Sequence, residues 1–501
     1  MSDLLRGGRL SAARKDITEF TSSIKSDAKL LKHVVQINKA HVIMLIENGI
    51  IHRDHGSKIL EALSSLEDKW TLMPDVEDVH IFVEEEVIKR VGMDIGGNLN
   101  LAKSRNDQVA TAIRMALREE LLHIMETIFT LQESLIELAE KNIEVVVPGY
   151  THLQPAQPTT FAHYILAQFD ILERNLKRLT NAYKSVNLCP MGAGALATTS
   201  FPISRERVAD LLGFNGLIEN SIDAVSSRDF LLETLAALSI MAVDISRFVE
   251  DLIIWSSMEF SIIDLPDEFT STSSIMPQKK NPEILEVIRA RMGLVLSDFT
   301  AASIILKGLP STYNLDFQEA TPKLWDAIEV IFKSLWMLSE VIRNLKVKED
   351  AMKKPFLSFL TATEVANMLT RNYGVPFRIA HRIVGALVKA LIDDGKTLLD
   401  ATPEYLTKVS AEHLNLPLIV KTEELSRALD LAGFIESHSV RGGPSKKEVE
   451  RMILTRKKLL SDYRGEVLSM RRQIESAMVT LNSITESYVI QRSLSSMMRQ
   501  P

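Results

Sequence analysis

The sequence predicts an all-α protein built around long helical rods. Hydrophobic residues make up 46% of the 501 residues and aromatic residues only 6%, a composition that favours helix packing over sheet. Three stretches contain neither Gly nor Pro: 98–147, Leu217–Leu265 and Lys323–Lys354. A helix of about 30 residues spans about 45 Å. Rods of this length exceed the needs of a small domain and suit a bundle that also buries a face against partners.

The first 101 residues are expected to form a separate domain of shorter helices, because breakers recur at Gly49, Gly56, Pro74 and Gly92. Ser23 lies in this region, where a serine most simply caps a helix. His52 and His55 lie three residues apart, a spacing that puts both imidazoles on one helix face. Since no third ligand follows at a suitable distance, we interpret the pair as a solvated helix start and predict no metal site.

The second unit, residues 102–354, is expected to hold the central long-helix bundle. Its first rod carries apolar residues at helical spacing, namely Ile124, Ile128, Leu131, Leu135 and Leu138. Ser104 and Asp107 have the spacing of a capping box at the start of this rod. The capping box gives Ser104 and Asp107 a structural role but gives none to Arg105 and Asn106. Both are donors at a helix N-terminus, where they can hold a carboxylate.

Between the first two rods, the segment Pro148–Pro158 breaks the helical pattern. Its prolines and glycine present Thr151 and His152 from a constrained turn instead of a packed helix face. A lone histidine in a turn is usually structural or solvated, so the turn by itself assigns His152 no role. The next glycine-rich segment, Pro190–Ala197, lacks the Gly-Lys-Ser/Thr ending of a phosphate loop and is expected to be a close-packed turn.

The stretch Thr270–Glu286 begins as a run of small hydroxyl residues and then enters a helical pattern. Asn281 is a suitable N-cap, and Pro282 suits the first helical position. The helix N-terminus and the ammonium group of Lys279 would then lie near the hydroxyl-rich loop, a setting that attracts carboxylates. Taken alone, a loop of this composition is usually no more than exposed surface.

Residues 355–501 are expected to form a C-terminal domain of shorter helices, because breakers return at Gly374, Pro376, Gly385, Gly433 and Gly442–Pro444. The net charge of −7 and the lack of a basic tract argue against a nucleic-acid groove. Cys189 is the only cysteine, which excludes an intrachain disulfide and a cysteine zinc site. No stretch has the apolar character of a signal peptide or a membrane span. We therefore expect a cytoplasmic protein without nucleic-acid or membrane partners.

Several blocks of the sequence resemble one known family. Ser273–Pro282 resembles the signature of the aspartase/fumarase superfamily, and its Gln-Lys-Lys-Asn-Pro form resembles the argininosuccinate lyase family within it. Ser104–Val109 is similar to the second signature block of that family, and Thr151–Gln154 is similar to its Thr-His-Leu-Gln motif. Similar segments continue over essentially the whole chain: Gly7–Arg9, Glu77–His80, Ala224–Phe230, Tyr313–Glu319, Val375–His381 and Ser437–Gly443.

The resemblance implies a set of site residues. Ser273, as an alkoxide, would abstract a proton and His152 would protonate the leaving nitrogen, although the two roles can be exchanged. Glu286 would pair with the histidine and raise its basicity. The residues that the resemblance implies for substrate binding are Ser23, Arg105, Asn106, Thr151, Lys279, Asn281, Tyr313 and Gln318. No metal and no organic cofactor is implied.

The chain departs from the family pattern at three places. Ala102-Lys103 stands where a Gly-Arg pair usually precedes the serine, and Thr272 stands where glycine is usual. Thr321 replaces a lysine that often follows the glutamine, while Lys323 lies two residues further on. The sequence leaves open whether Lys323 takes over the contact of that lysine.

The fold that the resemblance implies is a three-domain, all-α lyase whose central helices form the core of a homotetramer, with each site completed by different subunits. A monomeric long bundle is the alternative. The implied reaction is the reversible elimination of fumarate from 2-(N-omega-L-arginino)succinate to give L-arginine, the last step of arginine biosynthesis. Two other functions stay open: a sister lyase that releases fumarate from adenylosuccinate, aspartate or malate, and a crystallin-like structural protein without catalysis.

Overall fold

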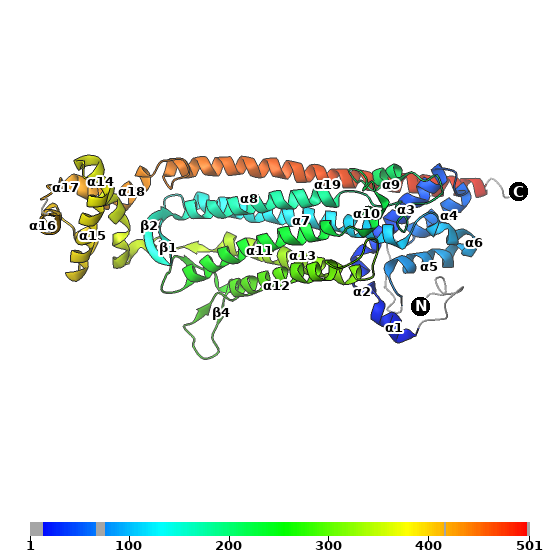
Figure 1. The fold of residues 1–501 in the computed structure, drawn as a ribbon, viewed down its shortest axis with the longest axis horizontal. Helices are drawn as coiled ribbons and strands as arrows, with labels where there is room; N and C mark the ends of the chain where they lie inside the picture. Colours follow the sequence, from blue (N-terminus) through cyan, green and yellow to red (C-terminus); the bar gives the residue numbers. More distant parts are fainter. Residues whose placement is uncertain (1–13, 67–75, 415–416, 498–501) are drawn as a thin grey trace.

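The computed structural model describes residues 14–66, 76–414 and 417–497 of the chain. Long helices run side by side along one axis, and a smaller group of helices lies at one end (Figure 1). The prediction of a helical protein with long rods is therefore confirmed. Within the described residues, strands are limited to three two-stranded pairs. Gly7–Arg9, one of the segments similar to the family, lies outside the described residues.

The N-terminal part consists of short helices, as the recurring breakers predicted. They are α1 (Lys15–Thr21), α2 (Ile24–Asp27), η1 (Ala28–Leu30), α3 (Leu31–Glu47), α4 (Arg53–Ser64), α5 (Val79–Val91), α6 (Met93–Gly96) and η2 (Gly97–Asn100). His52 is the N-cap of α4, where its Nδ1 accepts the Asp54 N–H at 3.3 Å. The interpretation of His52 as part of a helix start is therefore confirmed.

Five long helices form the bundle: α7 (Arg105–Lys141), α8 (Phe161–Val186), α11 (Asp229–Ser256), α12 (Glu283–Leu306) and α13 (Phe317–Asn344). Each packs on the next, in the order α8, α7, α13, α12, α11 and back to α8, around a continuous apolar core. Two short helices, α9 (Arg205–Leu211) and α10 (Ser221–Ser226), precede α11. In the part of the chain that the structure describes, no helix is long and apolar enough to cross a membrane.

Two of the expected rods differ from the observed helices. The rod expected over Leu217–Leu265 is divided, because Ser227 takes an extended conformation between α10 and α11. The rod expected over Lys323–Lys354 ends at Asn344 and begins earlier, at Phe317, so that α13 includes Pro322. A proline in the second turn removes one backbone hydrogen bond. The rest of α13 packs on α7 and α12 and offsets this loss.

The strands lie at the breaks between the rods. β1 (Val146–Thr151) and β2 (Gln154–Thr160) form an antiparallel hairpin between α7 and α8. β4 (Ser271–Thr272) and β5 (Lys280–Asn281) form a second hairpin that leads into α12, after η3 (Asp267–Phe269). β3 (Ile263–Asp264) pairs with β6 (Lys346–Val347) and joins the ends of α11 and α13.

A separate apolar core lies in the C-terminal group of helices. These are η4 (Ala351–Lys353), η5 (Pro355–Thr361), α14 (Ala362–Tyr373), α15 (Phe377–Asp393), η6 (Leu398–Asp400), α16 (Pro403–Leu414), α17 (Thr422–Leu429) and α18 (Leu431–Ser437). The buried residues between Val365 and Leu429 contact one another and form a cluster distinct from the core of the bundle.

The last helix contradicts the expectation of short helices throughout 355–501. α19 (Lys446–Met497) is one helix of 52 residues that returns along the bundle over α7, α8, α3 and α4 (Figure 1). Its buried apolar residues recur every seven positions, at Ile453, Leu460, Val467, Ile474 and Leu481. This is the narrow seam of a coiled coil, and it leaves most of the helix polar. We infer that the C-terminal unit ends near Ser437 and that α19 belongs to the bundle.

Ion pairs follow the same seven-residue period along α19 and α7. Lys457, Arg464 and Arg471 pair with Glu140, Glu133 and Glu126, respectively. The residue numbers of the paired side chains rise along α19 as they fall along α7, so the two helices run antiparallel with a constant register. The pairs flank the apolar seam and support the antiparallel packing of α19 on α7.

Replacing Glu126, Glu133 and Glu140 together by Gln should lower the free energy of unfolding by about 1–2 kcal/mol in low salt, because each exposed pair contributes about 0.5 kcal/mol. The loss should shrink in 1 M salt, where the Debye length is about 3 Å. Urea unfolding in low and high salt measures both effects. Glu137→Gln, on the same helix but outside the ladder, is the control, and an equal loss at both salt concentrations would contradict an electrostatic ladder.

Candidate active site

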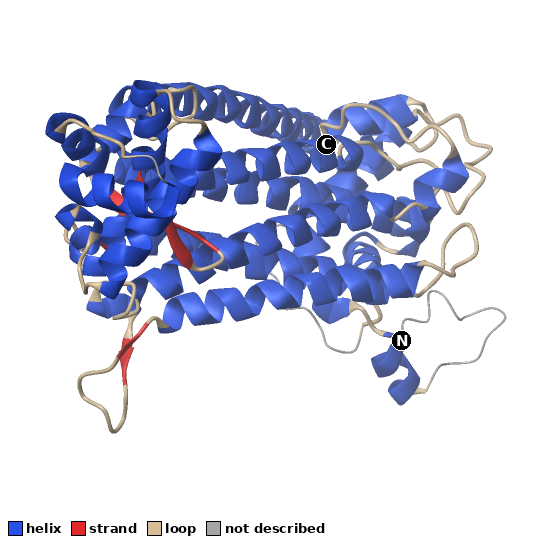
Figure 2. Cartoon of the chain, turned by 60° about the vertical axis from the view of Figure 1, so that its left-hand side comes forward, coloured by secondary structure: helices blue, strands red, loops and turns tan. Residues whose placement is uncertain are grey.

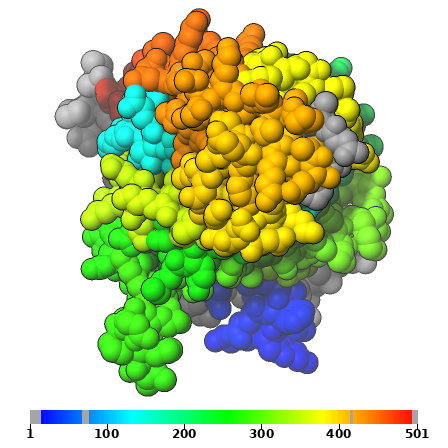
Figure 3. Space-filling view, turned by 90° about the vertical axis from the view of Figure 1, so that its left-hand side faces the viewer, coloured from blue at the N-terminus to red at the C-terminus, as the bar shows by residue number. Residues whose placement is uncertain are grey.

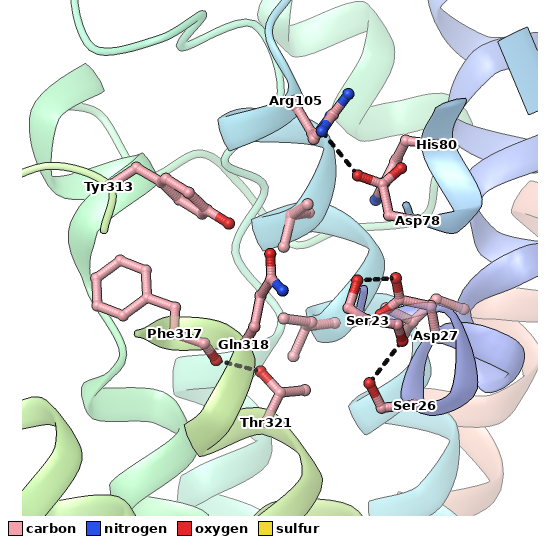
Figure 4. Close-up of a pocket in the computed structure, with 13 residues that line it drawn as sticks. Ser23, Ser26, Asp27, Asp78, His80, Arg105, Tyr313, Phe317, Gln318 and Thr321 are labelled. Carbon is pink, nitrogen blue, oxygen red and sulfur yellow. Dashed lines mark hydrogen bonds and ion pairs between the residues drawn. The ribbon is translucent and has the colours of Figure 1, made fainter. Parts of the chain in front are cut away.

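Four of the residues predicted to bind substrate line one cavity (Figure 4): Ser23, Arg105, Tyr313 and Gln318. The cavity lies where the start of α2, the first turns of α5 and α7, and the beginning of α13 meet. These four predicted residues, far apart in the sequence, therefore lie close together in the fold.

Ser23 precedes α2 but does not cap it. Its hydroxyl donates to Asp27 Oδ2 at 2.6 Å, and its backbone N–H donates to the carbonyl of Glu77 at 3.0 Å. The helix-cap interpretation of Ser23 is therefore wrong, since its hydroxyl bonds to a cavity carboxylate instead of a backbone N–H. Burial raises the pKa of Asp27 to about 6; the Ser23 hydrogen bond opposes this rise and the charge of Asp78 adds to it.

Arg105 is the first residue of α7 and reaches across the cavity to the start of α5. Its Nη1 lies 2.9 Å from Asp78 Oδ2 and 3.5 Å from Glu77 Oε1. Asp78 is also the N-cap of α5, because its Oδ1 accepts the N–H of Ile81 at 2.8 Å. Asp78 is buried. One ion pair thus holds two helix starts at the cavity wall.

Asn106 turns away from the cavity, and its Nδ2 donates to the carbonyl of Ala195 at 3.1 Å. The next residue, Asp107, is fully buried and completes the predicted capping box with Ser104. Its Oδ2 also accepts the N–H groups of Gly192 and Gly194, at 3.1 and 2.9 Å. The start of α7 is therefore tied to the Pro190–Ala197 turn, which is buried up to Gly194, as predicted, but exposed from Ala195 to Ala197.

Tyr313 and Gln318 close the cavity on the side of α13. The Tyr313 ring meets Phe317 edge to face at 5.6 Å, and burial raises the pKa of the Tyr313 phenol. Gln318 Nε2 donates to the carbonyl of Thr21 at 3.1 Å, which ties α13 to the segment before Ser23. The phenol and the amide belong to one wall of the cavity (Figure 4).

The departures from the family pattern have structural consequences here. Ala102 takes the left-handed conformation, with φ 63°, a conformation that glycine adopts at no steric cost. Lys103 is half-buried, and its ammonium donates to Asn38 Oδ1 on α3. Thr321 lines the cavity, but Lys323 does not, and its ammonium lies 3.9 Å from Asp326 instead. In this chain Lys323 therefore does not replace the family lysine at the cavity.

Thr151 and His152 lie at the tip of the β1–β2 hairpin. His152 and Leu153 are the two turn residues, and both are left-handed, with φ 54° and 56°. This is the conformation that a two-residue hairpin turn requires. Both Thr151 and His152 are exposed, so neither side chain is committed to the core of this chain.

Ser273 and Lys279 lie in the loop between β4 and β5, which stands out from the body of the molecule (Figures 2 and 3). Ser273 Oγ accepts the N–H groups of Ile275 and Met276 at 3.3 and 3.2 Å. Asn281 was expected to cap α12, but it pairs with Ser271 in the hairpin. This strand pairing was not predicted; because it includes Asn281, Pro282 becomes the N-cap and Glu286 lies exposed in the first turn.

The three groups of predicted site residues do not meet within one chain. α12, with 24 residues, separates the Ser273 loop from Tyr313, and a helix of this length spans about 36 Å. α7, with 37 residues, separates Arg105 from the β1–β2 hairpin, a span of about 55 Å. In Figure 1 both hairpins lie toward the end that carries α14–α18, and α2 and α5 lie toward the other end.

The predicted set of substrate-binding residues omitted the cavity's two carboxylates and its imidazole: Asp27, Asp78 and His80. Burial lowers the pKa of His80 to about 4, so its ring is neutral at ordinary pH. Asp27 follows Ser23 by one helical turn, a spacing that could have indicated a shared face. Asp78 and His80 belong to the similar segment Glu77–His80, but only the fold brings this segment next to Arg105.

Comparison with known protein families and curated proteins gives matches over nearly the whole chain. A family profile described as Lyase matches residues 8–296, and one described as Argininosuccinate lyase C-terminal matches residues 359–436. The argininosuccinate lyase of Methanocaldococcus jannaschii is 41% identical over 93% of this chain and 96% of its own. The argininosuccinate lyase of Methanosarcina mazei is 41% identical over 97% of this chain and 99% of its own.

Solved structures with the same architecture are also found. EDDS lyase in complex with formate superposes with a TM-score of 0.86 at 26% identity, covering 96% of this chain and 97% of that chain. A class II fumarase from Schistosoma mansoni superposes with a TM-score of 0.70 at 17% identity, covering 85% of this chain and 95% of that chain. At 17% identity, the similarity to the fumarase supports the fold alone.

Replacing Asp27 by Asn should stabilise the protein at pH 8 by about 1–3 kcal/mol. The folded pKa of about 6 lies above the unfolded value of about 3.9. The folded state therefore binds the proton more tightly, and wild-type stability falls as the pH rises through this window. The Asn side chain keeps an acceptor for Ser23 and has no charge to bury.

Urea unfolding at pH 4 and pH 8 measures this effect. The gain from Asp27→Asn should be present at pH 8 and nearly absent at pH 4, where the wild-type carboxyl is protonated when folded. Asp94→Asn, at an exposed acid on α6, is the control and should change little at either pH. A gain of equal size at both values would show that burial of the Asp27 charge is not its cause.

Proposed function

Because the chain belongs to the argininosuccinate lyase family of the aspartase/fumarase superfamily, we infer its mechanism from the residues described above. The protein is a carbon–nitrogen lyase that reversibly eliminates fumarate from 2-(N-omega-L-arginino)succinate and gives L-arginine, the last step of arginine biosynthesis. The mechanism rests on one observation above all: Ser23, Arg105, Tyr313 and Gln318, four of the residues implied for substrate binding, lie on one cavity.

The chemistry explains why such a site needs many donors. The carbon that loses its proton lies next to a carboxylate, so proton removal places a second negative charge on that group. Donors and cations must be in position before a base can act. A base then takes the proton, and an acid assists the departure of the guanidino nitrogen.

We assign the arginine part of the substrate to the cavity in Figure 4. That part carries a guanidinium and an ammonium group, and the cavity offers the carboxylates of Asp27 and Asp78 as partners. The Ser23 hydroxyl, the Gln318 amide and the Tyr313 phenol supply further hydrogen bonds. Charge-assisted hydrogen bonds of this kind are about twice as strong as neutral ones.

We assign the succinate part to the two hairpins, with Ser273 as the base and His152 as the acid. The Ser273 oxygen already accepts two backbone N–H groups, and such donors favour the alkoxide over the neutral hydroxyl. Thr151, Lys279 and Asn281 would hold the carboxylates. The exposed Glu286 is the partner assigned to His152, and Asn106 remains a predicted donor. Exchanging the acid and base roles is the second possibility.

This assignment requires more than one chain, so we propose a homotetramer with sites shared between subunits. The long helices hold the cavity and the hairpins of one chain apart. A neighbouring chain of opposite direction can bring its hairpins to this cavity. Large apolar residues on three bundle helices are exposed and support such contacts: Ile240 and Val243 on α11, Val287, Leu294 and Ile304 on α12, and Phe332 and Trp336 on α13. A patch of this kind usually marks a protein interface.

We also propose a cytoplasmic location. The single cysteine, Cys189, is buried, and burial raises the pKa of its thiol to about 12. An inert buried thiol is compatible with a reducing compartment.

Replacing Ser273 by Ala, or His152 by Asn, should lower kcat with argininosuccinate by about 100- to 10,000-fold, because each change removes a proton-transfer group. Fumarate absorbance in the ultraviolet measures the rate. Helical circular dichroism and the oligomer size should remain those of the wild type. A variant that keeps a near-normal rate would contradict the role given to that residue.

The same assay separates the alternative functions. Wild-type protein is supplied with argininosuccinate, adenylosuccinate, aspartate and malate in separate reactions. Fumarate should appear with argininosuccinate only. Release from another of the four would indicate a sister lyase, and no release from any of them would indicate a structural protein.

Shared sites predict activity from a mixture of two inactive variants. Arg105→Ala and Ser273→Ala subunits, mixed in equal amounts, dissociated and reassembled, should regain about one quarter of the wild-type sites, because each site draws these residues from different chains. Arg105→Ala with Gln318→Ala is the matched control, since both residues lie on the cavity of one chain and no intact site can form. Lack of recovery in the first mixture, despite reassembly to the wild-type size, would refute shared sites.

A further inference from the structure

The hairpin that carries His152 depends on its neighbours for its position. β1 and β2 form an isolated two-stranded pair, and such a ribbon is at most marginally stable by itself in water. Tyr150 in β1 contacts the ring of Phe260 at 5.2 Å. The position of His152 at the tip therefore depends on the residues that fix β1 and β2 to their neighbours.

His163, in the first turn of α8, holds the end of β2. Its Nδ1 lies 2.9 Å from Thr159 Oγ1, and its Nε2 lies 2.9 Å from the carbonyl oxygen of Gly442. A carbonyl can only accept, so Nε2 carries the hydrogen, and in the neutral ring Nδ1 accepts the Thr159 hydroxyl. The backbone N–H of His163 also donates to Thr160 Oγ1, the N-cap of α8. One imidazole thus joins β2 to a segment far along the chain.

The segment that receives the His163 N–H is a rigid turn between α18 and α19. Gly442 has φ 87°, and the Gly443 N–H donates to the carbonyl of Val440 at 2.8 Å. A Cβ at Gly443 would lie 2.2 Å from the carbonyl oxygen of His438, so no other residue fits. The Gly442 N–H donates to Glu448 Oε2 at 3.0 Å, and Glu448 pairs with Arg451 in the first turns of α19. Gly442 is therefore held by hydrogen bonds at both its backbone N–H and its carbonyl oxygen.

We propose that His163 is a positioning residue for His152: by bridging the Thr159 hydroxyl and the Gly442 carbonyl, it anchors the β1–β2 hairpin to the turn before α19. This inference rests on the proposed function, which gives His152 a role in proton transfer. His163 itself does not touch the substrate. Its contribution is to keep the hairpin tip at the distance that proton transfer requires, since a misplacement of about 1 Å can cost about 100-fold in rate.

Two independent substitutions remove this bridge. His163→Leu removes both hydrogen bonds, and Thr159→Val removes the hydroxyl at the other end of the bridge. Each should lower kcat with argininosuccinate by about 10- to 100-fold while KM rises by less than about 3-fold, because Thr151 at the same tip is only one of several residues that hold the substrate. Thr159→Ser keeps the hydroxyl and should restore most of the rate. His123→Leu, at an exposed histidine on α7, is the matched control.

A double-mutant cycle distinguishes positioning from general damage. If His163 acts through His152, His163→Leu should change the residual rate of the His152→Asn enzyme by less than about 2-fold, because the group that it positions is already absent. An equal loss in both backgrounds, or no loss in the wild-type background, overturns the proposal. If His163→Leu alters the circular dichroism, Thr159→Val replaces it in the cycle with His152→Asn, and the same two outcomes support or overturn the positioning role.

The outcomes also separate this inference from the proposed function. A near-normal rate for His152→Asn would remove the role of His152 itself, and with it the basis of this proposal. A large loss for His152→Asn, combined with equal losses for His163→Leu in both backgrounds, would remove only the positioning role.

Discussion

The fixed rise of the α-helix is the constraint on which the arrangement of this protein depends. α12 begins beside the Ser273 loop and ends before Tyr313, so these two parts of the proposed site lie a helix length apart in one chain. α7 separates Arg105 from the β1–β2 hairpin in the same way. Straight helices packed on one another cannot bend to bring such residues together. Assembly of several chains can bring the separated parts of the proposed site together without bending any helix.

The start of α7 gathers several buried and half-buried polar groups. Asp107 receives three backbone N–H groups, Arg105 pairs with Asp78, and Lys103 reaches Asn38. Burying charges costs free energy unless each is hydrogen-bonded. An apolar core would be a simpler source of stability. The polar cluster instead orients the walls of the cavity, which is the pattern expected where function sets the local composition.

Local sequence features predicted local structure well in this chain. The capping box at Ser104 and Asp107, the breaks at Pro148–Pro158, and the rods between them are all properties of a few neighbouring residues. The prediction missed α19, because its apolar seam occupies one position in seven and Gly465 interrupts the pattern. It misplaced the cap of α12, because Asn281 pairs with Ser271, and strand pairing across a hairpin overrides the local preference of asparagine for a cap.

The sequence by itself determined most of the helical segments and the residue types at the breaks between them, because helix periodicity and turn chemistry depend on adjacent residues. Only the tertiary structure decided which of these residues share a cavity. Arg105 reaches Asp78, and Asn106 donates to the carbonyl of Ala195. His163 meets Gly442 across most of the chain. Such partners depend on how distant segments approach one another when they bury a common core, and no local pattern records that approach.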